Sequence, residues 1–100
     1  MSKIYAISEL ASVISPIAQM YGIKKVALFG SYSKGTQTDS SDIDLLIDKG
    51  TLKGLFAFNG FVNAVSDALG KPVDVMTYHS LNRSLIKDAV DSEVVLYEQP

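Results

Sequence analysis

The stretch Ser41-Asp42-Ile43-Asp44-Leu45-Leu46-Ile47-Asp48 decides the fold expected of this chain. Its side chains alternate, which is typical of a β-strand with one buried face. Ile43, Leu45 and Ile47 share one face of a strand predicted over 42–48. The carboxylates of Asp42 and Asp44 share the other face, roughly 6–7 Å apart along the chain.

This pair of carboxylates has two interpretations. Two aspartates on one strand face repel each other and resist burial unless a cation lies between them. Mg²⁺ accepts such oxygen ligands and usually combines one or two carboxylates with substrate phosphates. The alternative is an edge strand whose acidic face is simply turned to solvent. From Asp42 and Asp44 alone, the two interpretations are equally supported.

A second feature precedes the acidic strand. Residues 24–29 form a short, mostly apolar run that predicts a buried strand, and Gly30-Ser31 follow it directly. A glycine there allows a sharp turn and close approach of the backbone to a ligand, and a following helical turn would direct N–H groups at a phosphate. On its own the pair is more simply a turn with a capping serine.

A third feature lies downstream, where Asp74 interrupts the apolar strand predicted over 72–77. Valines flank Asp74 and would take the core face, so it could merely point to solvent. If Ser31 and Asp42 share one site, strands 24–29 and 42–48 must be antiparallel. For Asp74 to reach that site, strand 72–77 must run parallel to 42–48, and parallel neighbours need a long crossover. The helix predicted over 52–69 supplies it.

The remaining pattern completes an α/β (α+β) domain with a small mixed β-sheet. Helices are predicted over 8–21, with Ser8 as N-cap and a kink or restart at Pro16, and over 80–90, with Ser80 as N-cap. A last short strand is predicted over 93–97. The length of 100 residues suits one domain, 1–100.

The composition excludes several classes of protein. There is no cysteine, so disulfide frameworks and thiolate zinc sites are excluded, and a reducing cytoplasm is the expected location. No apolar run is long enough to span a membrane. Nine basic residues face eleven acidic ones, which is too balanced for a nucleic-acid-binding footprint. Eight of the eleven acids are Asp, which favours turns, caps or metal ligands over helix surfaces.

The three features together resemble a known family. Gly30-Ser31, then Asp42-x-Asp44, then Asp74 on a later strand is the pattern of nucleotidyltransferases of the DNA polymerase β superfamily. The surrounding segments 28–35, 41–45 and 69–75 resemble its minimal nucleotidyltransferase (MNT) group, and the resemblance covers nearly the whole chain.

The resemblance implies a site and a reaction. Asp42, Asp44 and Asp74 would be the catalytic, metal-binding carboxylates for two Mg²⁺ ions, with ATP as substrate and pyrophosphate as leaving group. Gly30 and Ser31 would hold the phosphates. Lys34 stands where many relatives have arginine, so it offers a point charge in place of a bidentate partner. Whether Asp74 is a base or only a ligand stays open.

The resemblance also implies a partner. Chains of this kind resemble MntA-type antitoxins, which transfer AMP to a tyrosine of a HEPN ribonuclease toxin. The alternative is a catalytically silent module that neutralises the toxin by binding. A generic Mg²⁺-nucleotide binder or an aminoglycoside-type transferase fragment is a weaker third reading. The nucleotide preference, the acceptor, the number of nucleotides transferred and the state as homo- or hetero-oligomer stay open.

Five further residues are candidates for a functional or a core position. His79 is expected in a loop or cap, because a single histidine is a poor metal site. Arg83 lies on a predicted helix surface and could meet a phosphate or a partner. Phe58 fits the core stripe of helix 52–69 beside Leu55 and Val62, whereas Phe56 and Phe61 do not. Those two either bury a second side of the helix or form an exposed apolar patch.

Overall fold

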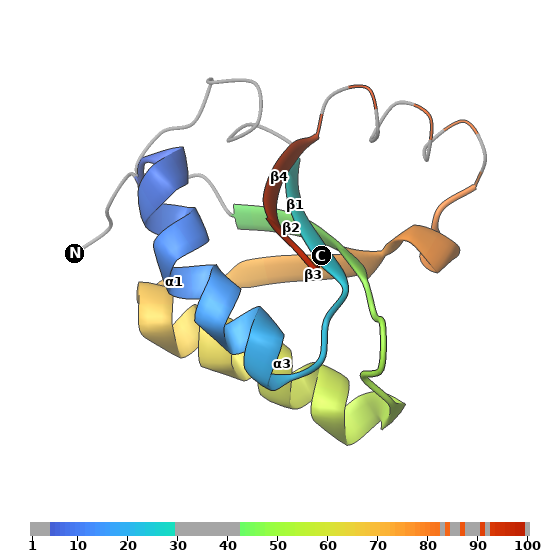
Figure 1. Ribbon diagram of the computed structural model, residues 1–100, viewed down its shortest axis with the longest axis horizontal. Helices are drawn as coiled ribbons and strands as arrows, with labels where there is room; N and C mark the ends of the chain where they lie inside the picture. Colours follow the sequence, from blue (N-terminus) through green and yellow to red (C-terminus); the bar gives the residue numbers. More distant parts are fainter. Residues whose placement is uncertain are drawn as a thin grey trace.

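A mixed four-stranded sheet is the centre of the fold (Figure 1). The computed structural model describes residues 5–29, 43–82, 84, 87, 91 and 93–99. The sheet order is β3-β2-β1-β4. The elements in chain order are α1 (Ile7–Met20), β1 (Lys25–Phe29), β2 (Ile43–Asp48), α3 (Gly54–Leu69), β3 (Val73–Thr77), the short 3-10 helix η1 (Tyr78–Ser80) and β4 (Val94–Glu98).

The strand directions confirm the predicted topology. β1 pairs with β2 in antiparallel register, and β2 pairs with β3 in parallel register. α3 is the crossover between the two parallel strands, as their shared direction requires. β4 adds antiparallel to the outer edge of β1, with a register shift between Val26 and Ala27. The predicted strand at 93–97 is therefore present, displaced by one residue.

Both long helices cover one face of the sheet, and the core lies between them and the strands (Figure 1). The alternation in β2 explains this, because Ile43, Leu45 and Ile47 all point into that core. Ala27 and Leu46 point to the opposite face and are also fully buried, although they are not part of the same core cluster. We call this second side of the sheet, which bears neither α1 nor α3, the open face.

The start of α1 differs from the prediction. Ala6, and not Ser8, is the N-cap, and its backbone N–H donates to Glu9 Oε1 at 3.1 Å. The Glu9 side chain thus supplies the first-turn acceptor that the prediction assigned to a serine hydroxyl. Pro16 lies inside a continuous helix, so no restart occurs there. The helix ends at Met20, with Tyr21 as its C-cap, and Gly22 follows with a φ of +72°.

α3 ends at Leu69 as predicted but begins at Gly54, two residues later than predicted, and its buried face also differs from the prediction. Phe61 is fully buried and is the largest of the fully buried side chains, although it was placed outside the core stripe. Leu55 was placed in that stripe and is 73% exposed. Phe58 is half-buried against the core, as expected, and Phe56 is 96% exposed. Phe61 therefore belongs to the core, whereas Phe56 lies on the surface.

The predicted helix over 80–90 falls largely on residues outside the described part of the chain. Its predicted N-cap is wrong, because Ser80 belongs to η1 and its hydroxyl donates to the Thr77 carbonyl at 2.7 Å. Leu81 follows with an extended backbone. Among the residues described, no helix has the length and apolarity needed to cross a bilayer.

Candidate active site

Asp44 and Asp74 lie side by side on neighbouring parallel strands. They are direct partners in the register of β2 and β3, which places their backbones about 4.8 Å apart. Both side chains belong to the open face, because the residues that flank them point into the core. Asp44 is half-buried and Asp74 is exposed. The geometry inferred from the sequence, with carboxylates from two parallel strands at one place, is confirmed.

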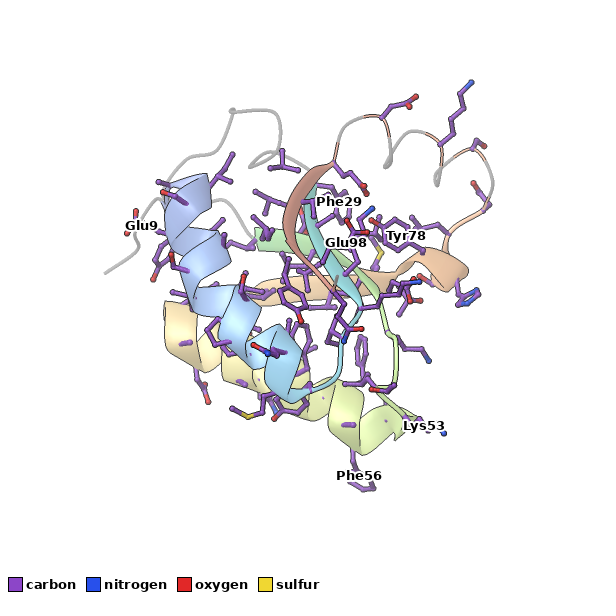
Figure 2. The ribbon with its side chains drawn as sticks, in the orientation of Figure 1. Glu9, Phe29, Lys53, Phe56, Tyr78 and Glu98 are labelled. Atoms are coloured by element: carbon purple, nitrogen blue, oxygen red, sulfur yellow. The ribbon has the colours of Figure 1, made fainter. Side chains whose placement is uncertain are left out.

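The end of β1 lies at the same place. Phe29, its last residue, is the register partner of Asp44 on the strand's other side, and Gly30 is the next residue along the chain (Figure 2). β1 therefore ends beside the aspartate pair. Gly30, Ser31, Lys34 and Asp42 themselves lie outside the described residues, and their roles stay predictions.

The donor chemistry of the pair fits a hard divalent cation. Two carboxylates from adjacent strands offer the oxygen ligands that Mg²⁺ accepts, and such sites are usually completed by substrate phosphates. Within the described ranges no cluster of three or more acidic or histidine side chains forms a metal site. Asp42, the predicted third carboxylate from the same strand, precedes β2 by one residue and is not among them.

A second polar cluster, formed by Lys25, Tyr78 and Glu93, was not predicted from the sequence. Lys25 Nζ lies 2.6 Å from Glu93 Oε1 and 5.3 Å from the centre of the Tyr78 ring. The Tyr78 hydroxyl donates to the second oxygen of the Glu93 carboxylate. Burial, and then this hydrogen bond, raise the pKa of Tyr78 well above the ordinary value for tyrosine.

This cluster joins three elements and has a structural role. It connects the start of β1, the 3-10 turn after β3 and the residue before β4. The only sequence feature that pointed to it was a lysine at the start of an otherwise apolar strand. His79 is exposed in η1, which agrees with the expected loop position, and Arg83 is outside the described residues.

Comparisons with known proteins agree with this fold. A candidate protein adenylyltransferase of Methanocaldococcus jannaschii is 38% identical over 89 residues, which cover 89% of this chain and 95% of that protein. The protein adenylyltransferase MntA of Thermococcus cleftensis is 26% identical over 85 residues, covering 81% of this chain and 86% of that protein.

Among solved structures, a toxin–antitoxin complex with AMP-PNP contains a similar chain. The TM-score is 0.75 at 25% identity, over 89% of this chain and 73% of that chain. The family model described as polymerase beta, nucleotidyltransferase matches residues 12–100. With the paired aspartates on the open face and relatives that align over most of their length, this chain belongs to the polymerase β nucleotidyltransferase family.

Proposed function

We propose that this protein transfers AMP from ATP to a tyrosine hydroxyl of a partner HEPN ribonuclease toxin in the cytoplasm, and so acts as its antitoxin. The observation that carries the proposal is the register of Asp44 beside Asp74 in a nucleotidyltransferase chain. Two relatives are named for protein adenylyl transfer, and a similar solved chain belongs to a toxin–antitoxin complex with an ATP analogue.

The three aspartates would have different roles. Asp42, Asp44 and Asp74 would hold two Mg²⁺ ions, which supply neutralisation of the charge that develops on the phosphates. Asp44 is half-buried on a central strand, so its carboxylate is held in a fixed place. Asp74 is exposed on the edge strand, where an incoming side chain can reach it. We therefore assign Asp74 the proton of the attacking hydroxyl.

The reaction balances with these groups. The acceptor oxygen forms a bond to the α-phosphorus, the bond from that phosphorus to the bridging oxygen breaks, and pyrophosphate leaves. The hydroxyl proton passes to the Asp74 carboxylate. Gly30, Ser31 and Lys34 would hold the β- and γ-phosphates in line with the attack, and the backbone N–H groups of the turn would supply part of this grip.

We treat residues 1–100 as a single minimal nucleotidyltransferase domain. In support, the described residues share one hydrophobic core cluster, to which both helices and all four strands contribute. The acceptor hydroxyl would approach from the open face, where Asp74 is exposed.

The proposal is tested with the protein encoded beside this chain's gene. The two purified proteins are incubated with Mg²⁺ and ATP labelled at the α-phosphate, and the label on the partner is measured. The wild type should label the partner on tyrosine. Asp44→Asn and Asp74→Asn should lose the label, because each removes one of the paired carboxylates. Asp67→Asn is the matched control and removes an exposed acid on α3, on the other side of the sheet.

Two outcomes would contradict the proposal. If the partner takes up no label but is still neutralised by Asp44→Asn, the protein acts by binding and not by transfer. If label accumulates equally with the wild type and Asp44→Asn, the aspartate pair is not the catalytic centre. If the wild type labels the partner and Asp44→Asn does not, tyrosine-to-phenylalanine variants of the partner identify the acceptor and the number of nucleotides added.

A further inference from the structure

The open face has little accessible apolar surface. Among the described residues, only Met76 and Val95 are large hydrophobic side chains exposed on this face. Met76 is 37% exposed on β3, and Val95 is 46% exposed on β4. Since β3 and β4 are the two edge strands of the sheet, these side chains belong to opposite edges, about 14 Å apart at ~4.8 Å per strand.

A hydrogen bond crosses the open face between these two edges. Tyr78 directly follows β3, and its hydroxyl donates to the carboxylate of Glu93, which directly precedes β4. β3 ends where β1 begins, whereas β4 begins where β1 ends, so this bond runs diagonally across the sheet. Ala27 and Leu46, on the two central strands between them, are fully buried although they face away from both helices.

This diagonal leaves Met76 on the same side as the aspartate pair. Asp74 and Met76 are two residues apart on one face of β3, roughly 6–7 Å at ~3.3 Å per residue. Asp44 lies beside Asp74 in the sheet, and the buried Leu46 lies beside Met76. Within the described part of the chain, Met76 is therefore the exposed apolar side chain next to the paired carboxylates.

The expected direction of attack also leads to Met76. β1 ends at Phe29, beside Asp44, and Gly30 is covalently joined to Phe29. Under the proposed function, Gly30 and Ser31 hold the departing phosphates at this end of the strands. An in-line displacement places the attacking oxygen opposite the leaving oxygen. The acceptor would therefore approach from the other direction, which along β3 is the direction of Met76.

We propose that Met76 binds the aromatic ring of the acceptor tyrosine and so favours a phenolic hydroxyl over an aliphatic one. The choice of a tyrosine acceptor rests on the proposed function. The spacing between Asp74 and Met76 is close to the length of a tyrosine side chain, so the ring can lie on Met76 while its hydroxyl meets the Asp74 carboxylate. A thioether makes favourable contacts with aromatic rings, and its flexible side chain adapts to their position. A serine or threonine acceptor has no ring to place there.

The test is the kinetics of AMP transfer to the purified protein encoded beside this chain's gene, with Mg²⁺ and ATP labelled at the α-phosphate. Met76→Ala should lower kcat/KM for the partner about 10-fold, which corresponds to the loss of a strong sulfur–aromatic contact. The KM for ATP should not change, because the phosphates and the acceptor approach from opposite directions. Met76→Leu keeps an apolar side chain of similar volume and should recover most of the loss.

Val95→Ala is the matched control. It removes the other exposed apolar side chain of the open face, on the far side of the diagonal, and should leave the kcat/KM for the partner and the KM for ATP unchanged. Thermal denaturation should show Met76→Ala and Val95→Ala equally folded, because both positions are exposed on edge strands.

Affinity measured without nucleotide provides a second readout. Met76→Ala should weaken the binding of the partner that has its acceptor tyrosine. It should not weaken the binding of a partner in which alanine replaces that tyrosine, because the ring that contacts Met76 is then absent. Such non-additivity is the mark of a direct contact between two side chains.

The inference is wrong if Met76→Ala keeps the wild-type kcat/KM for the partner, or if it weakens the binding of both partner forms equally. A raised KM for ATP in Met76→Ala would place the nucleotide on this side chain and would also overturn the inference. Each of these results leaves transfer by the wild type intact. Failure of the proposed function is distinct, because the wild type itself then transfers no label, and this would refute the assignment of Met76 as well.

Discussion

Replacing Asp74 by asparagine should stabilise the metal-free protein and weaken its response to Mg²⁺. Asp74 and Asp44 are register partners on β3 and β2. At about 5 Å two unit charges repel by about 0.8 kcal/mol in water, and Asp74 is exposed, so the aqueous value applies. Asp74→Asn removes this repulsion. For a domain of this size the gain corresponds to an increase in Tm of about 3–6 °C at low salt.

Mg²⁺ should reverse the order of stability. A ligand at ten times its Kd stabilises the folded state by about 1.4 kcal/mol. The wild type gains this amount, and a variant that lacks one of the paired carboxylates gains much less. The variant should therefore melt above the wild type in EDTA and below it in excess Mg²⁺. High salt should reduce the difference in EDTA, because it screens exposed charges.

Thermal denaturation in EDTA, and at several Mg²⁺ concentrations, measures both effects. Asp67→Asn, on the other side of the sheet, changes the net charge by the same amount and should show neither. An Asp74→Asn variant that melts below the wild type in EDTA would show that the aspartates do not repel each other significantly. An unchanged Mg²⁺-dependent shift would show that Asp74 is not a metal ligand. Either result refutes the reasoning from the register.

Three further predictions concern stability. Gly50 and Gly70 both have a positive φ, but a Cβ at Gly50 would lie 2.6 Å from a backbone oxygen, whereas nothing lies within 4 Å at Gly70. Gly70→Ala should therefore lower the free energy of unfolding by about 1 kcal/mol for its positive φ alone, and Gly50→Ala should lower it by more, as measured in urea titrations. Phe61→Ala should cost about 3–5 kcal/mol because its side chain is fully buried, whereas Phe56→Ala should change stability by no more than about 0.5 kcal/mol. The raised pKa of Tyr78 means that the unfolded state releases this proton first, so stability should fall as the pH rises above about 10, and Tyr78→Phe should flatten that fall in denaturation curves measured against pH.

The strand topology was predictable because its evidence is local. Alternation in residues 42–48 identifies the buried face of β2, and the helix that follows requires β3 to be parallel. The placement of Asp44 beside Asp74 follows once both are assigned to corresponding positions near the start of their strands. Strand alternation and the crossover requirement were sufficient for this prediction.

The face of α3 was mispredicted for a geometric reason. Steps of three and four residues connect Leu55 to Leu69 through Phe58, but they connect Phe58 to Leu69 through Phe61 equally well. The second stripe is the buried one, because the first turn of α3 extends past the end of α1 (Figure 1) and leaves Leu55 and Phe56 exposed. Periodicity alone does not show where a helix passes the edge of its neighbour.

The cluster of Lys25, Tyr78 and Glu93 was unpredictable for another reason. Lys25 and Glu93 are 68 residues apart, and their contact exists only because β4 returns to pair with β1. A propensity or spacing rule contains no information on such a contact. The N-cap of α1 was missed for a related reason, because the acceptor is the side chain of Glu9 within the helix and not the residue at the cap.

The core packing of α3 also affects the geometry of the candidate active site. Asp44 and Asp74 are 30 residues apart and share one face only in the observed register of β2 and β3. A slip of one residue in β3 would turn Asp74 toward the helices and a valine toward the open face. Phe61 and Leu69 anchor the crossover that delivers β3 in that register. Mild substitutions such as Phe61→Leu should thus reduce transfer activity through the placement of Asp74, although Phe61 itself lies on the other side of the sheet.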